Sequence, residues 1–209
     1  MRVLPLFLPA LIAALVAALS VPVATGRAAA AWLEPDAAYS AVRVMRSGEM
    51  EMRGPVHHDD GKERWEIATQ GMRQVMIRRP DQQRMLMMMP DMNMGMWLDL
   101  SQTQQMSSAE HYVDRQPEAL GREAQGGEMT TKYRLVEDTE RGSYTILFWV
   151  TDDGIPLRIE GSSEQGGFEM ELSDLKRGPQ DPSLFEPPDG LQLMPANPAM
   201  MGPMMGGGQ

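Results

Sequence analysis

Apolar and polar residues alternate in short runs along the middle of the chain, and turn residues separate these runs. The spacing predicts an antiparallel β protein of about nine or ten strands. In the first run Val42 and Val44 alternate with Arg43, which predicts a strand with the valines on its buried face. In a later run Trp65 and Ile67 share a face. Because a flat sheet of this size would leave long edges, we expect it to curl into an antiparallel half-open β-barrel.

The stretch MLMMMPDMNMGM (85–96) is apolar on both faces of its expected strand. Side chains on a strand alternate, which places Met85, Met87 and Met89 on one face and Leu86 and Met88 on the other. Pro90-Asp91 ends this strand. Methionine is unbranched and polarisable, so the face contacts either a protein core or an apolar ligand of variable shape.

The second half of the domain contains further predicted strands, which follow a segment without strand-like alternation. SSAEHYVDRQPEAL (107–120) predicts a short helix that a serine caps and Pro117 limits. YTILFWVT (144–151) and IPLRIEG (155–161) flank Asp152-Asp153-Gly154, which predicts a hairpin. The last residues, 194–209, are rich in Pro, Gly and Met, carry no charged side chain and predict a disordered tail.

The N-terminus has the pattern of a secretory signal peptide. Arg2 precedes the apolar run 4–24, and small residues follow it, with cleavage expected near Ala30 or Ala31. The alternative is an uncleaved membrane anchor, since the run approaches the length that spans a bilayer. The expected organisation is a signal peptide at 1–31, a β domain at 32–193 and the tail, in a periplasmic protein with no transmembrane segment once it is mature.

Charge and cysteine content exclude several functions. Removing residues 1–31 removes two arginines and no acids, so the net charge becomes 17 − 29 = −12. That charge argues against nucleic-acid binding and against docking on anionic lipid headgroups. The chain has no cysteine, which excludes disulfides, thiolate metal sites and a lipid-modified cysteine.

Four stretches of the sequence carry a resemblance to known families. DDGIPLRIEG and GGFEMELSDLKRGPQDPSLFEPPDGLQLM (166–194) resemble the C-terminal signature of LolA-like periplasmic proteins, with Pro156 after the turn. GEMEMRGPVHHDDG and RRPDQQRMLMMMPDMNMGM resemble the related domain-of-unknown-function family 4412. The resemblance implies a half-barrel of antiparallel sheet with one or two short covering helices and an apolar cavity. LolA itself carries lipoproteins by their acyl chains. This chain departs from it in its methionine content, its acidity and Leu191 in place of a tyrosine.

The leading hypothesis is therefore an exported, non-catalytic protein that binds an apolar ligand, such as an acyl chain, a lipoprotein or an apolar peptide segment, with an envelope protein as a further candidate partner. Enzyme motifs such as GxSxG, HExxH and a phosphate-binding glycine loop are absent from the sequence. The expected cavity lining consists of Trp65, Ile67, Met85, Met87, Met89, Trp97, Phe148 and Phe168.

The alternative hypothesis is a soft-metal accessory protein that binds copper or silver through thioethers. Three sulfurs along one straight strand lie about 6.6 Å apart in steps and cannot meet at one ion. A curled loop could gather Met92, Met94 and Met96, and the tail offers Met200, Met201, Met204 and Met205. His57-His58-Asp59-Asp60 predicts a solvated turn rather than a metal site. No cofactor is expected under the leading hypothesis.

Overall fold

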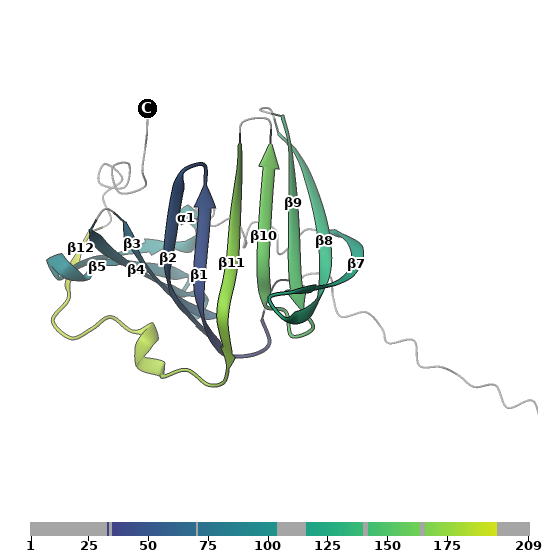
Figure 1. Cartoon of the computed structure of the whole chain (residues 1–209). Helices are drawn as coiled ribbons and strands as arrows, with labels where there is room; N and C mark the ends of the chain where they lie inside the picture. Colours follow the sequence, from purple (N-terminus) through teal and green to yellow (C-terminus); the bar gives the residue numbers. More distant parts are fainter. Residues whose placement is uncertain are drawn as a thin grey trace, which may run out of the picture.

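The computed structural model of the chain describes residue 33 and residues 35–69, 71–103, 116–139, 142–163 and 166–195. Their strands form one sheet of 12 strands in the order β12-β6-β5-β4-β3-β2-β1-β11-β10-β9-β8-β7, antiparallel except between β12 and β6 (Figure 1). The strands are β1 (Tyr39–Ser47), β2 (Met50–Asp59), β3 (Lys62–Thr69), β4 (Met72–Arg79), β5 (Arg84–Met89), β6 (Met94–Asp99), β7 (Glu118–Gln125), β8 (Glu128–Thr139), β9 (Gly142–Thr151), β10 (Pro156–Ser163), β11 (Gly166–Arg177) and β12 (Gln192–Met194). The predicted class, a mainly β protein with a curved open sheet, is confirmed.

Short helical turns join some of these strands. Two single turns of 3-10 helix, η2 (Pro80–Gln82) and η3 (Pro90–Met92), connect β4 to β5 and β5 to β6. Each begins at a Pro-Asp pair and ends at a residue with positive φ, Gln83 or Asn93. The other helices are α1 (Leu100–Thr103) and η5 (Pro182–Phe185). No helix among the described residues has the length and apolar content to cross a bilayer.

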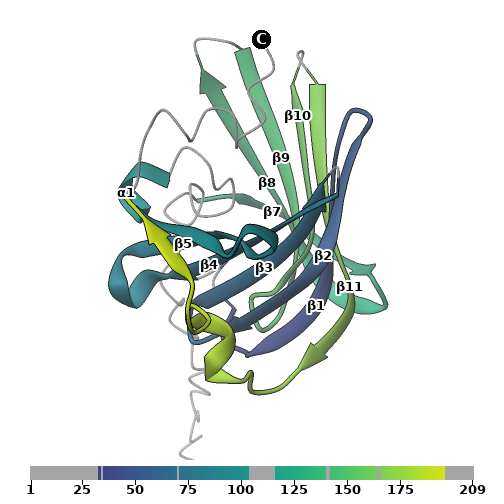
Figure 2. The same cartoon turned by 90° about the vertical axis from the view of Figure 1, so that its left-hand side faces the viewer.

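The sheet curls into a half-barrel, and the sharpest bend lies between β2 and β3. These strands pair only from Val56–Trp65 to Asp59–Lys62. Beyond Val56, β3 crosses so close to β2 that a Cβ added at Gly54 would lie 1.7 Å from the Glu66 carbonyl oxygen. Figure 2 shows the result: β3, β4 and β5 cross in front of the wall formed by β1, β2 and β8–β11. Gly54 therefore permits the curl.

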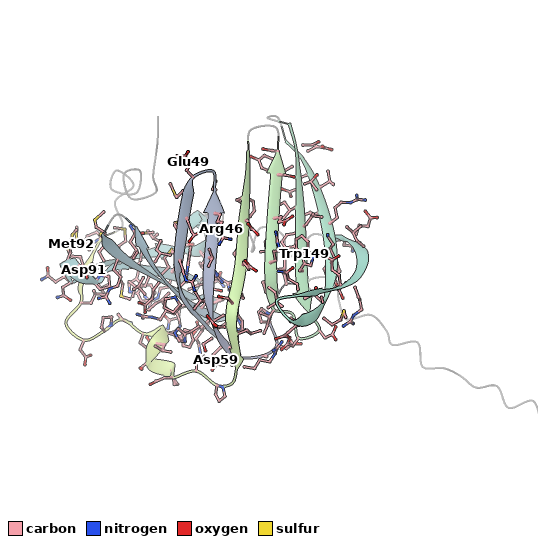
Figure 3. All side chains as sticks on the ribbon, in the orientation of Figure 1. Arg46, Glu49, Asp59, Asp91, Met92 and Trp149 are labelled. Atoms are coloured by element: carbon pink, nitrogen blue, oxygen red, sulfur yellow. The ribbon has the colours of Figure 1, made fainter. Side chains whose placement is uncertain are left out.

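Strand register defines two faces, since direct partners in a sheet point the same way. The concave inner face carries the largest core cluster, which includes Tyr39, Val56, Ile146, Phe148 and Ile159. The convex outer face of β1, β9, β10 and β11 carries charges, among them Arg46, which pairs with Glu51 and Glu169. Figure 3 shows Arg46 and Trp149 on this outer side.

The outer face of β4–β6 is covered by the chain's own C-terminal segment. Phe185, with 3% of its surface exposed, packs with Leu184 and Leu191 against the outer face. The residues it covers are Val75, Ile77, Leu86, Met88 and Trp97. Arg64 donates to the Leu184 carbonyl oxygen at 3.2 Å, and Arg79 donates to that of Phe185 at 3.1 Å. The outer half of the methionine strand is therefore ordinary core.

The local structure differs from the expectations in two places, and a third expectation is not tested. The short helix expected within 107–120 falls mainly on residues 107–115, which lie outside the described residues, and β7 begins at Glu118, after Pro117. Strand β7 escaped prediction because it is exposed and has no apolar alternation, so its backbone pairing with β8 alone defines it. The facing of β1 is also reversed: Arg43 points inward with Tyr39 and Ala41, and Val44 is buried on the outer face.

We expect Gly54→Ala to destabilise the fold severely, because its Cβ would overlap a backbone oxygen that cannot move without opening the bend. A loss of about 3 kcal/mol or more in the free energy of unfolding is the size of effect that overpacking with backbone shifts produces. Urea denaturation measures it. Gly71→Ala is the control, since its added Cβ meets nothing within 4 Å and costs only the strain of its positive φ, about 1–2 kcal/mol. Equal losses in the two variants would contradict the close crossing.

Candidate ligand-binding face

Methionines line the inner face at one end of the half-barrel. One row of direct cross-strand partners runs through Ala41, Val56, Trp65, Met76, Met87, Met96 and Met194. Alternation along the strands adds further methionines on the same face. We call the methionine band Met72, Met76, Met85, Met87, Met89, Met94, Met96 and Met194.

Methionine is selective for this face. On the outer face of the same strands the buried aliphatic residues are Val75, Ile77, Leu86 and Met88. The inner core of β8–β11 is built mainly from Leu, Ile, Val and Phe, with Met170 as a single methionine. Random enrichment in methionine would place it on both faces and in both halves. The band therefore reflects what this part of the inner face contacts.

The band is only partly buried. Met87 and Met96 are 8% and 3% exposed and pack with Leu98 and Met85. Met76, Met85, Met89, Met94 and Met194 are half-buried, and Met72 is exposed. A set of flexible thioethers with buried bases and accessible ends is suited to contacting a molecule of variable shape.

A row of polar residues crosses the inner face next to the band. The row consists of residues that are direct cross-strand partners of one another: Tyr39, His58, Glu63 and Arg78, followed by Met85 and Leu98. Arg43 lies on the same face of β1, two same-face positions from Tyr39, and makes a two-pronged ion pair with Glu63, with N–O distances of 2.8 and 2.7 Å. The His58 ring stacks on Tyr39 at 5.2 Å between centroids. The inner face therefore joins a charged, hydrogen-bonded patch to an apolar one.

Burial and ion pairing set the charge states in this row. Burial raises the pKa of Tyr39 and lowers the pKa of His58, so both side chains stay neutral. Burial opposes the ionisation of Arg43 and Glu63, but their mutual attraction outweighs it: the pKa of Arg43 is raised and that of Glu63 is lowered. His58 Nδ1 lies 3.3 Å from the Ala37 carbonyl oxygen, which can only accept, so Nδ1 carries the proton.

Trp65 Nε1 and Arg43 Nε are buried N–H groups on this face that have no acceptor among the described residues. The Arg43 guanidinium lies over the Trp65 ring at 5.2 Å, so the two side chains form one unit between the polar row and the band. A buried donor without an acceptor costs about 1–3 kcal/mol, which an acceptor oxygen on a ligand would offset.

The predicted cavity lining mostly falls on one face. Trp65 and Ile67 share the inner face with the band residues Met85, Met87 and Met89. Phe148 lies in the inner core, and Phe168 packs over Gly161, where an added Cβ would lie 2.1 Å from its ring. Trp97 is different. It pairs with Leu86 on the outer face, where Arg84 stacks on it at 3.8 Å, so it does not join this lining.

The predicted metal loop is not a loop. Met94 and Met96 lie in β6 on the inner face, and only Met92, 49% exposed on η3, projects from a turn (Figure 3). Strand β6 pairs with β5 and β12, and the alternation of side chains along it places Met94 and Met96 on one face. The flexibility expected from Asn93 and Gly95 therefore does not produce a curled loop. Met200, Met201, Met204 and Met205 lie outside the described residues.

The expected solvated turn at 57–60 is only partly present. The turn itself falls on Asp60-Gly61, both with positive φ, while the histidines belong to β2. His58 is buried, and His57 lies 2.8 Å from Gln180 on the C-terminal segment. No cluster of three His, Asp or Glu with metal-binding geometry occurs among the described residues.

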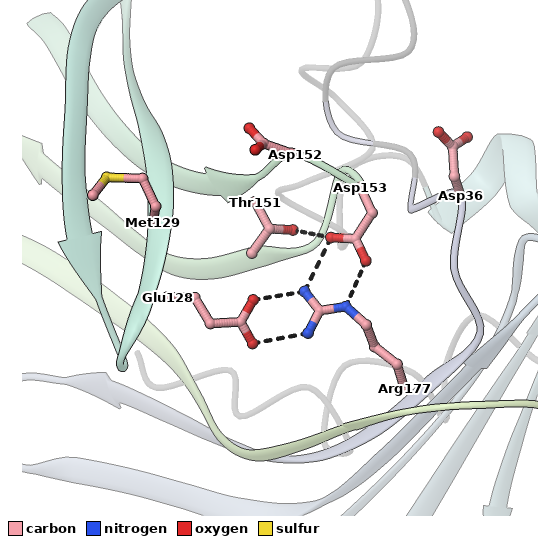
Figure 4. Close-up of a pocket in the computed structure, with 7 residues that line it drawn as sticks. All are labelled: Asp36, Glu128, Met129, Thr151, Asp152, Asp153 and Arg177. Carbon is pink, nitrogen blue, oxygen red and sulfur yellow. Dashed lines mark hydrogen bonds and ion pairs between the residues drawn. The ribbon is translucent and has the colours of Figure 1, made fainter.

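A separate open pocket lies at the end of β8, β9 and β11. Its lining is Asp36, Glu128, Met129, Thr151, Asp152, Asp153 and Arg177 (Figure 4). Arg177 donates to Glu128 at 2.8 and 2.7 Å and to Asp153 at 2.6 Å, and the hydrogen bond from Arg177 lowers the pKa of Asp153. Both carboxylates hold Arg177 in place, so this ion-paired cluster clamps β8 and β11 to the β9–β10 hairpin.

Solved structures share the fold at low sequence identity. No family model and no curated protein matches the sequence. An uncharacterized conserved protein from Thermus thermophilus is similar over 77% of this chain and 91% of its own, with 14% identity and a TM-score of 0.54. MucB is similar over 78% of this chain and 62% of its own, with 14% identity and a TM-score of 0.52, and its complex with MucA(peri) gives a TM-score of 0.50. The likeness shows the fold. The resemblance to LolA-like proteins and to family 4412 stays a prediction.

We expect His58 to make stability depend on pH. The pKa of His58 is lowered in the folded state. As the pH falls through about 6.5, this histidine therefore binds a proton in the unfolded chain but stays neutral in the folded chain. The free energy of unfolding therefore decreases from pH about 7.5 to about 5.5. His58→Phe keeps a ring against Tyr39 and cannot titrate, so its decrease over this range should be smaller. Denaturation at several pH values measures both; equal slopes would show that His58 is not the source.

Proposed function

We propose that this protein binds an apolar or amphiphilic molecule, such as an acyl chain, on the inner face of its half-barrel and carries no catalytic activity. The observation behind this proposal is the concentration of methionine on one face of β4–β6 and β12, while the opposite face has Met88 among Val75, Ile77 and Leu86. Thioether side chains adapt to ligands of variable shape, whereas branched side chains specify one packing.

The polar row supplies the second end of such a site. An acyl chain along the band would place a carboxylate or ester oxygen near Trp65 Nε1 and Arg43 Nε, which are buried donors without an acceptor among the described residues. Arg43 would add its charge, although Glu63 already neutralises it. This arrangement favours a neutral acceptor, such as an ester or amide carbonyl, over a free acid, because a carboxylate would approach Glu63 at a cost in repulsion.

A protein segment is the second class of occupant that we consider. MucB, which shares the fold, has been solved in complex with MucA(peri). An apolar peptide segment offers both side chains for the band and backbone carbonyls for Trp65 and Arg43. The two occupants can be distinguished on natively purified protein. Mass spectrometry of an organic extract identifies a bound acyl chain, and mass spectrometry of peptides identifies a bound protein segment. We also propose that the protein is exported to the periplasm, a compartment in which either an acyl chain or a protein segment could be bound.

We expect Met76→Glu to weaken the binding of a fluorescent acyl-ester probe at least tenfold. The substitution places a carboxylate in the middle of the band, and burying it against an alkyl chain costs more than the roughly 1.4 kcal/mol that corresponds to a factor of ten. Fluorescence titration of the exported chain measures the affinity. Met92→Glu is the control: it makes the same change at an exposed turn and should bind within about twofold of wild type. Equal losses, or no binding by the wild type, would refute the proposal.

We expect the exported chain to lack its first residues. Expressed at full length in a Gram-negative host, the protein should appear in the periplasmic fraction with a mass that corresponds to cleavage near Ala30 or Ala31. Intact-mass measurement locates the new N-terminus. Recovery of the uncleaved chain in the membrane fraction would favour an anchored protein instead.

A further inference from the structure

Four methionines of β5 and β6 form a rectangle on the inner face. Met87 pairs directly with Met96, and Met89 pairs directly with Met94. Residues two apart on a strand are separated by about 6.6 Å and paired strands by about 4.8 Å, so the four Cα atoms mark a rectangle of about those dimensions. Each corner lies about 4 Å from the centre, which is within the reach of an extended methionine side chain.

This arrangement removes the obstacle to metal binding that a single strand presents. Three thioethers in line along one strand diverge, but four thioethers on two paired strands can lean toward a common point. Met87 and Met96 are buried and fix one side of the rectangle. Met89 and Met94 are half-buried at the end next to η3, so a small ion can enter between them.

The surroundings favour a soft ion over a hard one. No cluster of His, Asp or Glu that could hold a hard or borderline cation occurs among the described residues, and the chain has no cysteine. Arg78 is the partner of Met85, one position outside the rectangle, so its charge lies on the far side from the entry. Neutral thioethers in an apolar setting select monovalent d¹⁰ ions, because sulfur is a soft ligand.

We propose that Met87, Met89, Met94 and Met96 form a thioether site for Cu(I) or Ag(I). These four residues also belong to the methionine band, but the metal site does not rest on the ligand proposal, because it depends on sulfur rather than on apolar surface. It differs from a flexible metal-binding loop or tail in that the pairing of β5 with β6 sets the spacing of its ligands.

Methionine-to-leucine substitutions test the site, because they keep volume and apolarity and remove only the sulfur. Ag(I) alone is titrated into the exported chain by calorimetry, and Cu(I) is measured by competition with a chromogenic chelator. We expect Met89→Leu and Met94→Leu each to weaken binding at least tenfold, and the fourfold variant to abolish it. Met88→Leu is the matched control: the same strand and a buried side chain, but on the outer face, with affinity expected within about twofold of wild type.

Two further measurements keep the outcome decisive. X-ray absorption of the Cu(I)-loaded wild type should show a shell of sulfur ligands alone. A variant with Leu at 200, 201, 204 and 205 separates the tail from the sheet. Unchanged binding in Met89→Leu and Met94→Leu, or complete loss in the tail variant, would overturn the inference. The acyl-ester probe is titrated into the metal-free wild type and its Met76→Glu variant, neither of which changes a ligand of the metal site, so failure of the metal site and failure of the ligand proposal are distinguishable.

Discussion

The close crossing of β3 over β2 at Gly54 is the constraint on which the rest of the structure depends. Twelve strands in a flat sheet would expose both faces, and neither face would gather a core. Because Gly54 has no side chain, the Glu66 carbonyl can pass over it, and the sheet turns back on itself. This bend makes one face concave and separates a half built on Leu, Ile, Val and Phe from a half lined with methionine.

Because of this bend, the two faces of the methionine-rich strand β5 lie in different surroundings. The outer face is covered by the C-terminal segment. Arg64 and Arg79 donate hydrogen bonds to backbone carbonyl oxygens of this segment, and Asn93 Nδ2 donates one to the Gly190 carbonyl oxygen. Leu86 and Met88 are therefore sealed and gain the full benefit of burial, about 25 cal/mol per Å². The inner face has half-buried thioethers, where a ligand or an ion finds both apolar surface and sulfur.

The polar row sets a limit on what this inner face can hold. A buried ion pair such as Arg43–Glu63 costs desolvation that its own attraction only roughly offsets, so it adds little to stability by itself. It does fix Arg43 over Trp65 and orient both toward the band. The same residues thus keep a charged group inside the half-barrel and leave two donors for a ligand that carries an acceptor.

The sequence by itself determined the β class, the hairpin at Asp152–Gly154 and the sharing of one face by Met85, Met87 and Met89, since these follow from period-two alternation and turn chemistry. Only the tertiary structure decided which face was inside. Arg43 and Trp97 were placed on the wrong side because alternation defines two faces but not their identity. Strand β7 has no apolar pattern, and only its pairing with β8 defines it. The pairing of Met87–Met89 with Met94–Met96 likewise depends on the register between two strands, which no single segment encodes.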